Sequence, residues 1–575
     1  MTYPIHIKSF KLKTFSTLFG FLFVLISFND LTANDNTGIE NETIIPKCGT
    51  PLVHEFLHNN STVNIRELFS SDDFDSDQID FLARPTGLDQ YYDSGFLRFH
   101  YTLDGNSAVD PSDSDTDGTP DYVENMASVF QMVIDNEITE FGFTQPPGDG
   151  WYTFNDNGGS DDYDIYIKTL GAGYYGFVRS EYYASNTGDN ENSEVIELNA
   201  RTSFMEMRNE YGGFPLGETE SIMVTAAHEF FHAIQYGYDY FNNNDIWMLE
   251  ATSTWIEDEV YDDVNDNYQY LLGWFDEPNT ALDEYSFHVY GSFIFFRYLS
   301  EHIDGINTIL KIFDYALPNT FLNTISFTSI EDALNDYDTN FDNEFKNMII
   351  SNLLLTDSEE AKPYTYEEAQ GYRDYGIEPE FEEVIDVPNE GTTFGYFGND
   401  LMHRACHYLQ IENPTPMVIT FIPSEANDNV SALVVLKTSD DNVYTYNLEN
   451  SKEISIPSNT ENFYIVILTG DDETAVNQYS IEFSPSLLSL NQNYPNPFNP
   501  IKELTTFDVY VPESGSASFN IYNILGMKVD GFVLTELETG LNEVTYTGKY
   551  LPSGVYIMQL KNSGKKKARR FTIIK

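Results

Sequence analysis

The chain has 575 residues, with 92 acidic and 29 basic side chains and a formal net charge of −63. This length predicts several domains. The negative charge argues against nucleic acid as a partner, because phosphates require a basic surface. Aromatic residues make up 15% of the chain, which is enough apolar material for packed cores and excludes a disordered acidic chain.

Residues 1–33 are predicted to be an export signal peptide. Three lysines precede the apolar run TFSTLFGFLFVLISF, and small residues follow at LTAND, so cleavage is expected near Ala33. The run is short for a membrane span, with an uncleaved anchor as the alternative. No later segment is apolar enough to cross a bilayer, and the mature chain is therefore expected to have no transmembrane segment.

Residues 34–89 form a polar N-terminal segment that contains HEFLH at 54–58. His-Glu-x-x-His is the zinc-protease signature, but here the helix would begin at Thr50 and end by residue 59. Both histidines flank a polar face, so nothing requires their burial, and we expect a short structural helix, with a pro-region at the mature N-terminus as the alternative. The two cysteines, Cys48 and Cys406, are compatible either with one disulfide or with two separate buried thiols.

The stretch DSDTDGTPDYVE, residues 113–124, fits the twelve-residue loop of an EF-hand. Only the helix after the loop is evident, so a structural Ca²⁺ site is expected rather than a sensor pair, with an acidic surface turn as the alternative. A second acidic stretch, NDNGGSDDYD at 155–164, lacks the full spacing and is predicted to be a turn. The predicted calcium ligands are Asp113, Asp115, Asp117, Thr119 through its carbonyl, Asp121 and Glu124.

A second His-Glu-x-x-His, HEFFH at 228–232, lies in a more apolar stretch. In SIMVTAAHEFFHAI, residues 221–234, its histidines and glutamate are the only ionisable side chains. A helix that is apolar on nearly every face is buried, and buried charges are expected to pair or to bind metal. His228 and His232 lie one turn apart on one face, which suits two imidazole ligands of a Zn²⁺ ion, with Glu229 beside them.

A third zinc ligand is predicted at Glu250. It is the one charge in the apolar opening of a helix expected over DIWMLEATSTWIEDEV, residues 245–260, with Asp245 as a plausible N-cap. The connection YGYDYFNNND is long enough to bring this helix against the first. The charged groups of HEFFH and the lone Glu250 would each be costly to bury alone, and their spacing allows them to meet. A catalytic zinc needs such a third protein ligand.

The motif AHEFFHAIQ, followed by WMLEAT and Trp255, resembles a family of secreted bacterial zinc metalloproteases of gluzincin type. The likeness extends from about Cys48 to the β-rich region. It implies a zincin-like α+β metallopeptidase domain, assigned to residues 90–385, that acts on a protein or peptide substrate. It also implies a zinc-activated water, with Glu229 as the general base.

The same resemblance suggests two supporting roles. Gluzincins commonly use a Tyr or His to stabilise the oxyanion, for which Tyr290 and His288 are the candidates, with core packing and a surface position as their alternatives. Thr254 stands where some gluzincins place an Asp that braces a zinc-bound histidine. Glu257, one turn further along the same face, is predicted to take that role.

After residue 385 the hydrophobic pattern changes to a period of two. Residues 386–485 contain MVITFIP, SALVVLKT, VYTYNL, FYIVILTG and YSIEF, which predict a β-sandwich. Residues 486–575 begin with a proline- and asparagine-rich break and contain a second set of short strands. The motifs NYPNPFNP, YNILG, LPSGVY and the basic run KKKARR before the final strand resemble the C-terminal sorting domain of the type IX secretion system. This resemblance implies an immunoglobulin-like β-sandwich, type IX machinery as partner and a secreted or cell-surface location; an ordinary adhesion domain is the alternative.

The sequence thus predicts a multidomain exported zinc endopeptidase: an α+β zincin-like domain, a β-sandwich and a sorting domain. The alternative from another class is a calcium-stabilised surface-binding protein with an inactive peptidase scaffold. Zinc-dependent hydrolysis of a non-peptide amide is a second enzymatic alternative.

Overall fold

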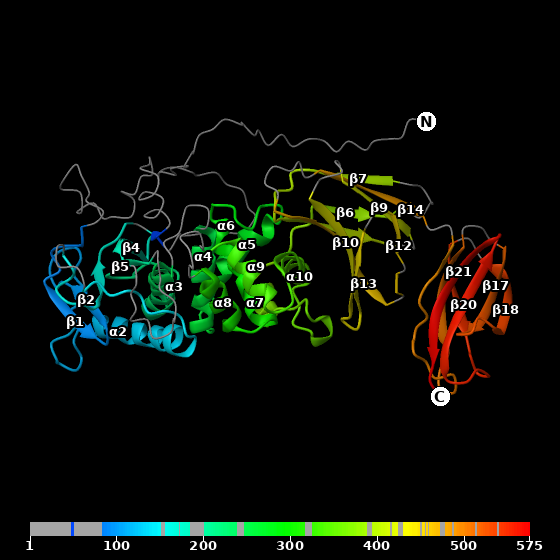
Figure 1. Ribbon diagram of the computed structural model, residues 1–575, viewed down its shortest axis with the longest axis horizontal. Helices are drawn as coiled ribbons and strands as arrows, with labels where there is room; N and C mark the ends of the chain where they lie inside the picture. Colours follow the sequence, from blue (N-terminus) through cyan, green and yellow to red (C-terminus); the bar gives the residue numbers. More distant parts are fainter. Residues whose placement is uncertain are drawn as a thin grey trace. The chain divides into compact units, whose positions relative to one another are not determined.

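The structure is a computed structural model (Figure 1). The described residues are 48–50, 83–150, 156–171, 173–184, 200–238, 246–316, 325–387, 394–414, 417–423, 429–448, 451–454, 456–457, 459–471, 478–485, 488–511, 515–537 and 540–575. The predicted signal peptide, the HEFLH sequence and Asp245 lie outside this set.

The first sheet provides the platform for the candidate site. Its strands follow the order β1-β2-β3-β5-β4, with β2, β3 and β5 parallel to one another and the edge strands β1 and β4 antiparallel to the strands beside them. The predicted strands around FLRFHYTL and YDIYIKTL are β2 and β3. The strands are β1 (Gln90–Ser94), β2 (Leu97–Tyr101), β3 (Tyr163–Lys168), β4 (Gly176–Tyr183) and β5 (Arg201–Arg208).

Helices pack against this sheet and against one another. Helix α3 contacts β4, β5, α2 and α4, and α4 in turn contacts α6 and α7. A π-helical turn, η3 (Asp135–Glu140), continues α2. The helices are α2 (Asp121–Ile134), α3 (Glu218–Tyr238), α4 (Ile246–Val260), α5 (Tyr268–Asp276), α6 (His288–Gly291), α7 (Phe293–His302), α8 (Ile306–Ala316), α9 (Phe327–Asn335), α10 (Phe341–Leu354), η4 (Glu359–Ala361) and α11 (Ala369–Tyr375).

The main hydrophobic core extends beyond the predicted limits of this domain. It includes Cys48, which precedes residue 90, and Cys406 and Tyr408, which follow residue 385. The Tyr408 hydroxyl donates to the Ile349 carbonyl of α10 at 2.9 Å. The core of this domain therefore includes residues from beyond both of its predicted boundaries, residues 90 and 385.

Two sheets with their own core form the next β-rich region. The first has the order β11-β10-β13-β8-β6 and the second β12-β9-β14-β7. Strand β9 coincides with the predicted MVITFIP. The strands are β6 (Glu383–Asp386), β7 (Phe394–Gly398), β8 (Cys406–Glu412), β9 (Met417–Pro423), β10 (Val430–Thr438), β11 (Val443–Asn447), β12 (Ser451–Ile454), β13 (Thr460–Thr469) and β14 (Tyr479–Pro485).

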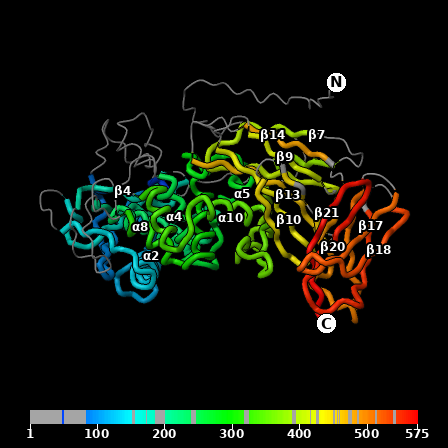
Figure 2. The backbone as a smooth tube through the Cα atoms, turned by 45° about the vertical axis from the view of Figure 1, so that its right-hand side comes forward, coloured from blue at the N-terminus to red at the C-terminus, as the bar shows by residue number. Residues whose placement is uncertain are grey.

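The C-terminal module has two further sheets, β15-β16-β19 and β18-β17-β20-β21, around a third core. Figure 2 shows β17, β18, β20 and β21 at the red end of the chain. The basic run was predicted to precede the last strand, but β21 begins at Lys565, which pairs with Asn562. The strands are β15 (Ser489–Leu490), β16 (Thr505–Val511), β17 (Gly515–Asn523), β18 (Lys528–Leu537), β19 (Gly540–Tyr546), β20 (Gly554–Asn562) and β21 (Lys565–Ile573). Across the described residues, no helix combines the length and apolar character needed to cross a membrane.

Candidate metal centre

Helix α3 carries both imidazoles and Glu229 into the interior. Every residue from Ser221 to Tyr238 except Met223 is buried. The ring centroids of His228 and His232 are 4.8 Å apart, so the one-turn spacing brings them to a common point. The predicted burial of this helix is therefore observed. His228, Glu229 and His232 are buried with it, which is unfavourable unless these groups are paired.

Glu250 approaches the same point from α4. Its Oε1 lies 3.2 Å from His232 Nε2, and its Oε2 lies 3.4 Å from His228 Nε2. Both Glu250 oxygens and His228 Nε2 are buried without a hydrogen-bond partner among the described residues. Buried polar atoms are normally satisfied, so the contacts of Glu250 with the two imidazoles bring the polar groups of α3 and α4 together in the interior.

The donor atoms have the spacing of a tetrahedral metal site. The ligand atoms of Cys48, His228, His232 and Glu250 all lie within 4.8 Å of one another, and Cys48 Sγ is 3.4 Å from His232 Nε2. Ligands about 2.0–2.3 Å from a tetrahedral zinc stand roughly 3.3–3.8 Å apart. The observed separations and the mixed nitrogen, oxygen and sulfur donors therefore fit Zn²⁺.

The outer nitrogen of His228 is held by Glu257, whose Oε1 lies 2.7 Å from Nδ1. The contact that the sequence predicted for Glu257 is thus present. Thr254 Oγ1 is buried and has no hydrogen-bond partner in the described part of the chain. The carboxylate orients the ring so that Nε2 faces the cluster.

The outer nitrogen of His232 has two partners that sequence reasoning missed. Its Nδ1 lies 2.8 Å from Gln235 Oε1 and 3.1 Å from Ser253 Oγ. The Gln235 amide donates to the Leu249 carbonyl at 3.1 Å, which links α3 to α4. The position of Gln235, three residues after His232 in an apolar helix, is a signal that could have been used.

Buried charges shift the protonation of these groups strongly. Burial lowers the pKa of His228, but Glu250 and Glu257 outweigh it and raise that pKa to about 10. Burial raises the pKa of Glu250, but His232 and His228 outweigh it and lower that pKa to about 2. For Glu229, burial dominates and raises the pKa despite the two histidines. Metal binding would therefore displace a proton from His228, since a ligating imidazole must be neutral.

Cys48 reaches the cluster from a position 184 residues before His232. The next residue, Gly49, donates its N–H to the Gly176 carbonyl of β4 at 3.1 Å. Thr50 Oγ1 donates to Glu229 Oε2 at 3.1 Å and accepts from the Val178 N–H at 2.9 Å.

Both cysteines are free and buried, so of the two alternatives left open by the sequence the structure has separate thiols. Burial, then the Glu229 and Glu250 carboxylates, raise the pKa of the Cys48 thiol well above its usual value. Cys406 belongs to β8 and lies in a different environment, described next.

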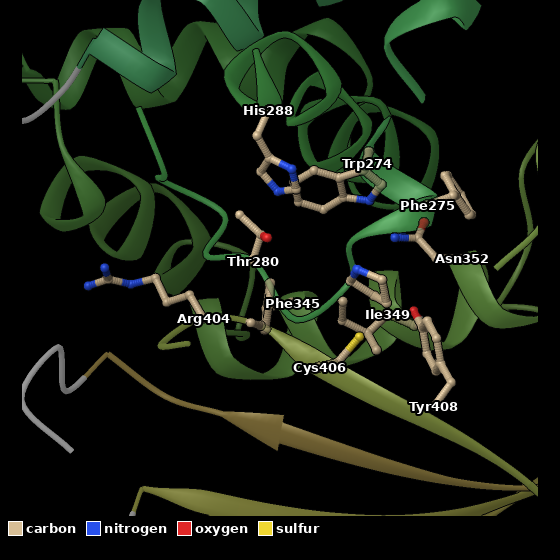
Figure 3. Close-up of a pocket in the computed structure, with 12 residues that line it drawn as sticks. Trp274, Phe275, Thr280, His288, Phe345, Ile349, Asn352, Arg404, Cys406 and Tyr408 are labelled. Carbon is tan, nitrogen blue, oxygen red and sulfur yellow. The ribbon is translucent and has the colours of Figure 1, made fainter. Parts of the chain in front are cut away.

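Of the two predicted oxyanion donors, only Tyr290 lies beside the cluster. Its ring centroid is 6.4 Å from that of His228. His288 instead stacks on Trp274, with centroids 4.4 Å apart, in a pocket also lined by Arg404 and Cys406 (Figure 3). Both donors belong to the short helix α6, where side chains two apart point in different directions. The structure therefore does not bring His288 to the metal cluster, and burial lowers the pKa of His288 to about 4.

The predicted calcium loop brings together the carboxylates of Asp113, Asp115 and Asp117, whose oxygens lie within 4.8 Å of one another. Gly118 adopts a φ of +104°, which suits the sharp turn. Asp121 accepts hydrogen bonds from the Ser114 N–H and hydroxyl.

The other two predicted calcium ligands lie at the end of the loop and on the helix that follows. The Thr119 N–H donates to Asp117 Oδ1 at 2.8 Å. Burial, then Asp117 and its acidic neighbours, raise the pKa of Glu124. Three of the six predicted ligands are thus clustered, while Asp121 bonds within the loop.

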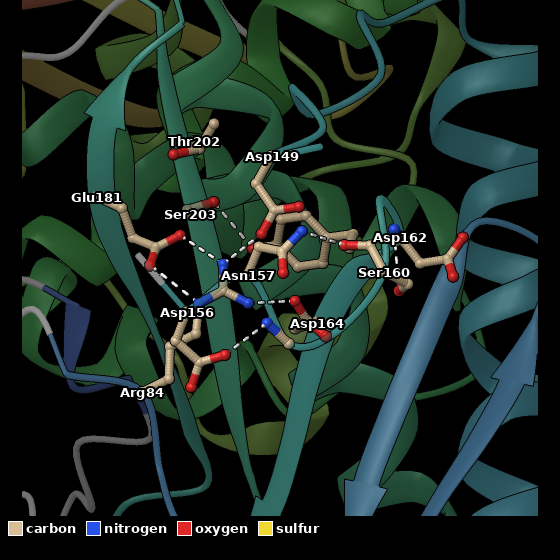
Figure 4. A network of polar contacts seen from close by, with 12 residues as sticks. Arg84, Asp149, Asp156, Asn157, Ser160, Asp162, Asp164, Glu181, Thr202 and Ser203 are labelled. Atoms are coloured by element: carbon tan, nitrogen blue, oxygen red, sulfur yellow. Dashed lines mark hydrogen bonds and ion pairs between the residues drawn. The ribbon is translucent and has the colours of Figure 1, made fainter. Parts of the chain in front are cut away.

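The described part of the second acidic stretch is a turn only up to residue 162, and its last two residues, Tyr163 and Asp164, begin β3. Asp156 accepts from the Gly158 N–H at 3.1 Å. Asp164 lies in β3 and belongs to a buried network around Arg84 (Figure 4). The Arg84 guanidinium also contacts Asp149 at 2.5 Å and Glu181 at 2.7 Å, and the Asp164 carboxylate additionally contacts His100.

Replacing Arg84 with methionine is expected to lower the free energy of unfolding by about 3–5 kcal/mol, because it leaves buried carboxylates without their cation. Burial already raises the pKa of Asp149 to about 7 with Arg84 present. Arg98→Met is the matched control, since Arg98 pairs with the half-exposed Asp93 and such pairs contribute about 0–1 kcal/mol. Urea unfolding of both variants checks the difference, and equal losses would contradict it.

Comparison with known proteins identifies the C-terminal module. Residues 492–575 match the secretion system C-terminal sorting domain, which confirms the predicted type IX sorting domain and indicates export followed by secretion or surface attachment. The comparison with curated proteins gave no match.

Several solved structures resemble parts of the chain at low similarity. PorZ, a surface component of the type IX secretion system of Porphyromonas gingivalis, is 19% identical over 16% of this chain and 14% of that chain, with a TM-score of 0.12. The β-glucuronidase of Parabacteroides merdae is 11% identical over 29% of this chain and 28% of that chain, with a TM-score of 0.15. This chain thus spans less than a third of either protein, and neither likeness carries an argument about its function.

Proposed function

We propose that the chain is an exported zinc-dependent endopeptidase with a zincin-like domain. The observation that carries this proposal is the convergence of His228, His232 and Glu250 on one buried point, with Glu229 on the same helix turn. Glu229 is buried beside this point without belonging to the grouped donors, and hydrolysis needs a base at that position.

Each residue has a defined task in this proposal. His228, His232 and Glu250 would hold Zn²⁺, which when bound supplies an acidified water and polarises a carbonyl. Glu229 accepts the proton of the attacking water and passes it to the leaving amine. The Tyr290 hydroxyl donates to the developing oxyanion. Glu257 and Gln235 keep the two imidazoles in the tautomer that presents Nε2.

A structural Ca²⁺ ion is proposed for the loop that begins at Asp113. The clustered carboxylates of Asp113, Asp115 and Asp117 repel one another, and a hard divalent cation with oxygen ligands would relieve that repulsion. This ion would stabilise the start of α2 rather than take part in hydrolysis.

The proposal is tested by measuring zinc content and casein hydrolysis in the exported protein and two variants. We expect about one zinc per chain in the parent, loss of zinc and of hydrolysis in His228→Ala, and no change in His54→Ala. His54 is the matched control because it occupies the same place in the other His-Glu-x-x-His sequence. Zinc loss in His54→Ala, or full zinc in His228→Ala, would contradict the assignment.

A further inference from the structure

The three residues Cys48–Thr50 fill two positions that a peptidase must keep open. Cys48 Sγ is one of four donor atoms grouped within 4.8 Å, with His228, His232 and Glu250. Structural zinc sites have four protein ligands, whereas catalytic sites have three and leave the fourth position to water. With Cys48 in place the donor set is that of a closed site.

The second position is the general base. Thr50 Oγ1 donates to Glu229 Oε2 at 3.1 Å and is itself fixed by the Val178 N–H at 2.9 Å. Thr50 is fully buried and Cys48 is 3% exposed. A water attacking from this side would have to displace the Thr50 hydroxyl, so one short segment covers both the metal position and the carboxylate.

The segment also pairs with the exposed edge of the sheet. Strand β4 ends the sheet, and Cys48 forms a parallel bridge to Gly176 there, with the Gly49 N–H bonded to the Gly176 carbonyl. An extended peptide adds to a sheet at such an edge. Cys48 and Gly49 therefore occupy positions on the β4 edge where an extended peptide could add.

The sulfur is prepared for metal rather than for packing alone. The Thr50 N–H donates to Cys48 Sγ at 3.3 Å, which fixes the position of the sulfur beside the cluster. The donor atoms grouped with the sulfur are an imidazole nitrogen of His228, an imidazole nitrogen of His232 and a carboxylate oxygen of Glu250. Thiolate is a preferred zinc ligand.

We propose that Cys48 is a fourth zinc ligand and that Cys48–Thr50 acts as an intramolecular inhibitor, which holds the exported protein latent until the segment leaves. This inference rests on the proposed peptidase function. With Zn²⁺ bound, release of the segment would exchange the Cys48 thiolate, which would take up a proton from solvent, for a water molecule, and it would free the Glu229 carboxylate from the Thr50 hydroxyl.

X-ray absorption at the zinc edge tests the ligand directly. We expect one sulfur at about 2.3 Å in the parent protein and in Cys406→Ala, and only nitrogen and oxygen ligands in Cys48→Ala, with zinc retained. Cys406 is the matched control because it is an equally buried free thiol outside the cluster. Absence of sulfur from the parent's zinc would overturn the inference.

Alkylation of the unmutated protein keeps the test independent of folding of the variant. Zinc is expected to hold the buried Cys48–Thr50 segment in place, so Cys48 resists iodoacetamide in the zinc-loaded protein and reacts once a chelator removes the metal and the segment is released. Cys406 belongs to strand β8 in the core and stays protected in both states. Peptide mass spectrometry reports the two sites separately. Equal reactivity of Cys48 with and without zinc would count against ligation.

Hydrolysis tests inhibition. If the thiolate is bound in at least about nine molecules in ten, freeing the site in Cys48→Ala raises casein hydrolysis at least about tenfold. Thr50→Val is expected to raise casein hydrolysis less than Cys48→Ala does, and its X-ray absorption spectrum should still show sulfur bound to zinc. If the zinc carries sulfur but casein hydrolysis does not increase in Cys48→Ala, the proposal that Cys48–Thr50 is an inhibitor is overturned.

The failures of the two proposals are distinguishable. An active parent enzyme whose zinc carries no sulfur leaves the peptidase proposal standing and removes this one. Zinc bound through sulfur, with no hydrolysis in the parent or in Cys48→Ala, would instead show a four-ligand structural site and overturn both the peptidase and the inhibitor.

Discussion

Replacing Glu229 with glutamine is expected to leave zinc bound and to reduce peptide hydrolysis by about 10²- to 10⁴-fold, the usual contribution of a general base. Glutamine has nearly the same shape and retains an oxygen for the Thr50 hydroxyl, so the segment around Thr50 keeps its place. It cannot accept the water's proton. The loss should therefore appear in kcat, with zinc content unchanged.

The free energy of unfolding gives a second readout of the same variant. Burial raises the pKa of Glu229, so a neutral amide removes a charge that the interior disfavours, and we expect stability to be unchanged or higher. Glu220→Gln, on the exposed first turn of α3, is the control and should retain hydrolysis. Undiminished turnover in Glu229→Gln would refute the mechanism.

Replacing Glu250 with glutamine is expected to weaken zinc binding by more than about 100-fold. Loss of a residue that only hydrogen-bonds a metal ligand costs up to about 100-fold, and loss of a ligand should cost more. Glu250 supplies the one carboxylate among the four donors, and its negative charge holds both imidazoles in contact. Competition with a chromophoric chelator measures the affinity.

Glu257→Gln is the matched control for this second prediction. Glu257 lies on the same helix and contacts the same imidazole, but at Nδ1 rather than on the metal side. Its loss is expected to cost about 10- to 100-fold in affinity. A larger effect from Glu257→Gln than from Glu250→Gln would exchange the two roles.

The sequence predicted the parts of this site that depend on local pattern. The burial of α3 followed from its lack of charges, and Glu250 followed from being the one charge in the apolar opening of a second helix. Glu257 followed from the resemblance to gluzincins, as the acidic residue one turn beyond Thr254. The sequence could not decide between Tyr290 and His288. Which of the two side chains faces the cluster depends on whether the segment is a helix or a strand, and a short apolar segment does not show which period it follows.

Cys48 and Thr50 could not be placed from the sequence for a different reason. Their positions depend on pairing with β4 across more than a hundred residues, and nothing in the local pattern of either segment specifies that partner. The sorting domain, by contrast, was predictable from its motifs. Strand β21 begins earlier than predicted, because the turn at Ser563 and Gly564 places the lysines that follow it in the strand.

The buried Arg84 network gives the latent form a natural point of separation. Downstream of Arg84, the chain is fixed by ion pairs to Asp149, Asp164 and Glu181. Upstream, the described residues that touch the site are only Cys48–Thr50. None of these three ion pairs involves Cys48–Thr50, so removal of that segment would leave the Arg84 anchor intact.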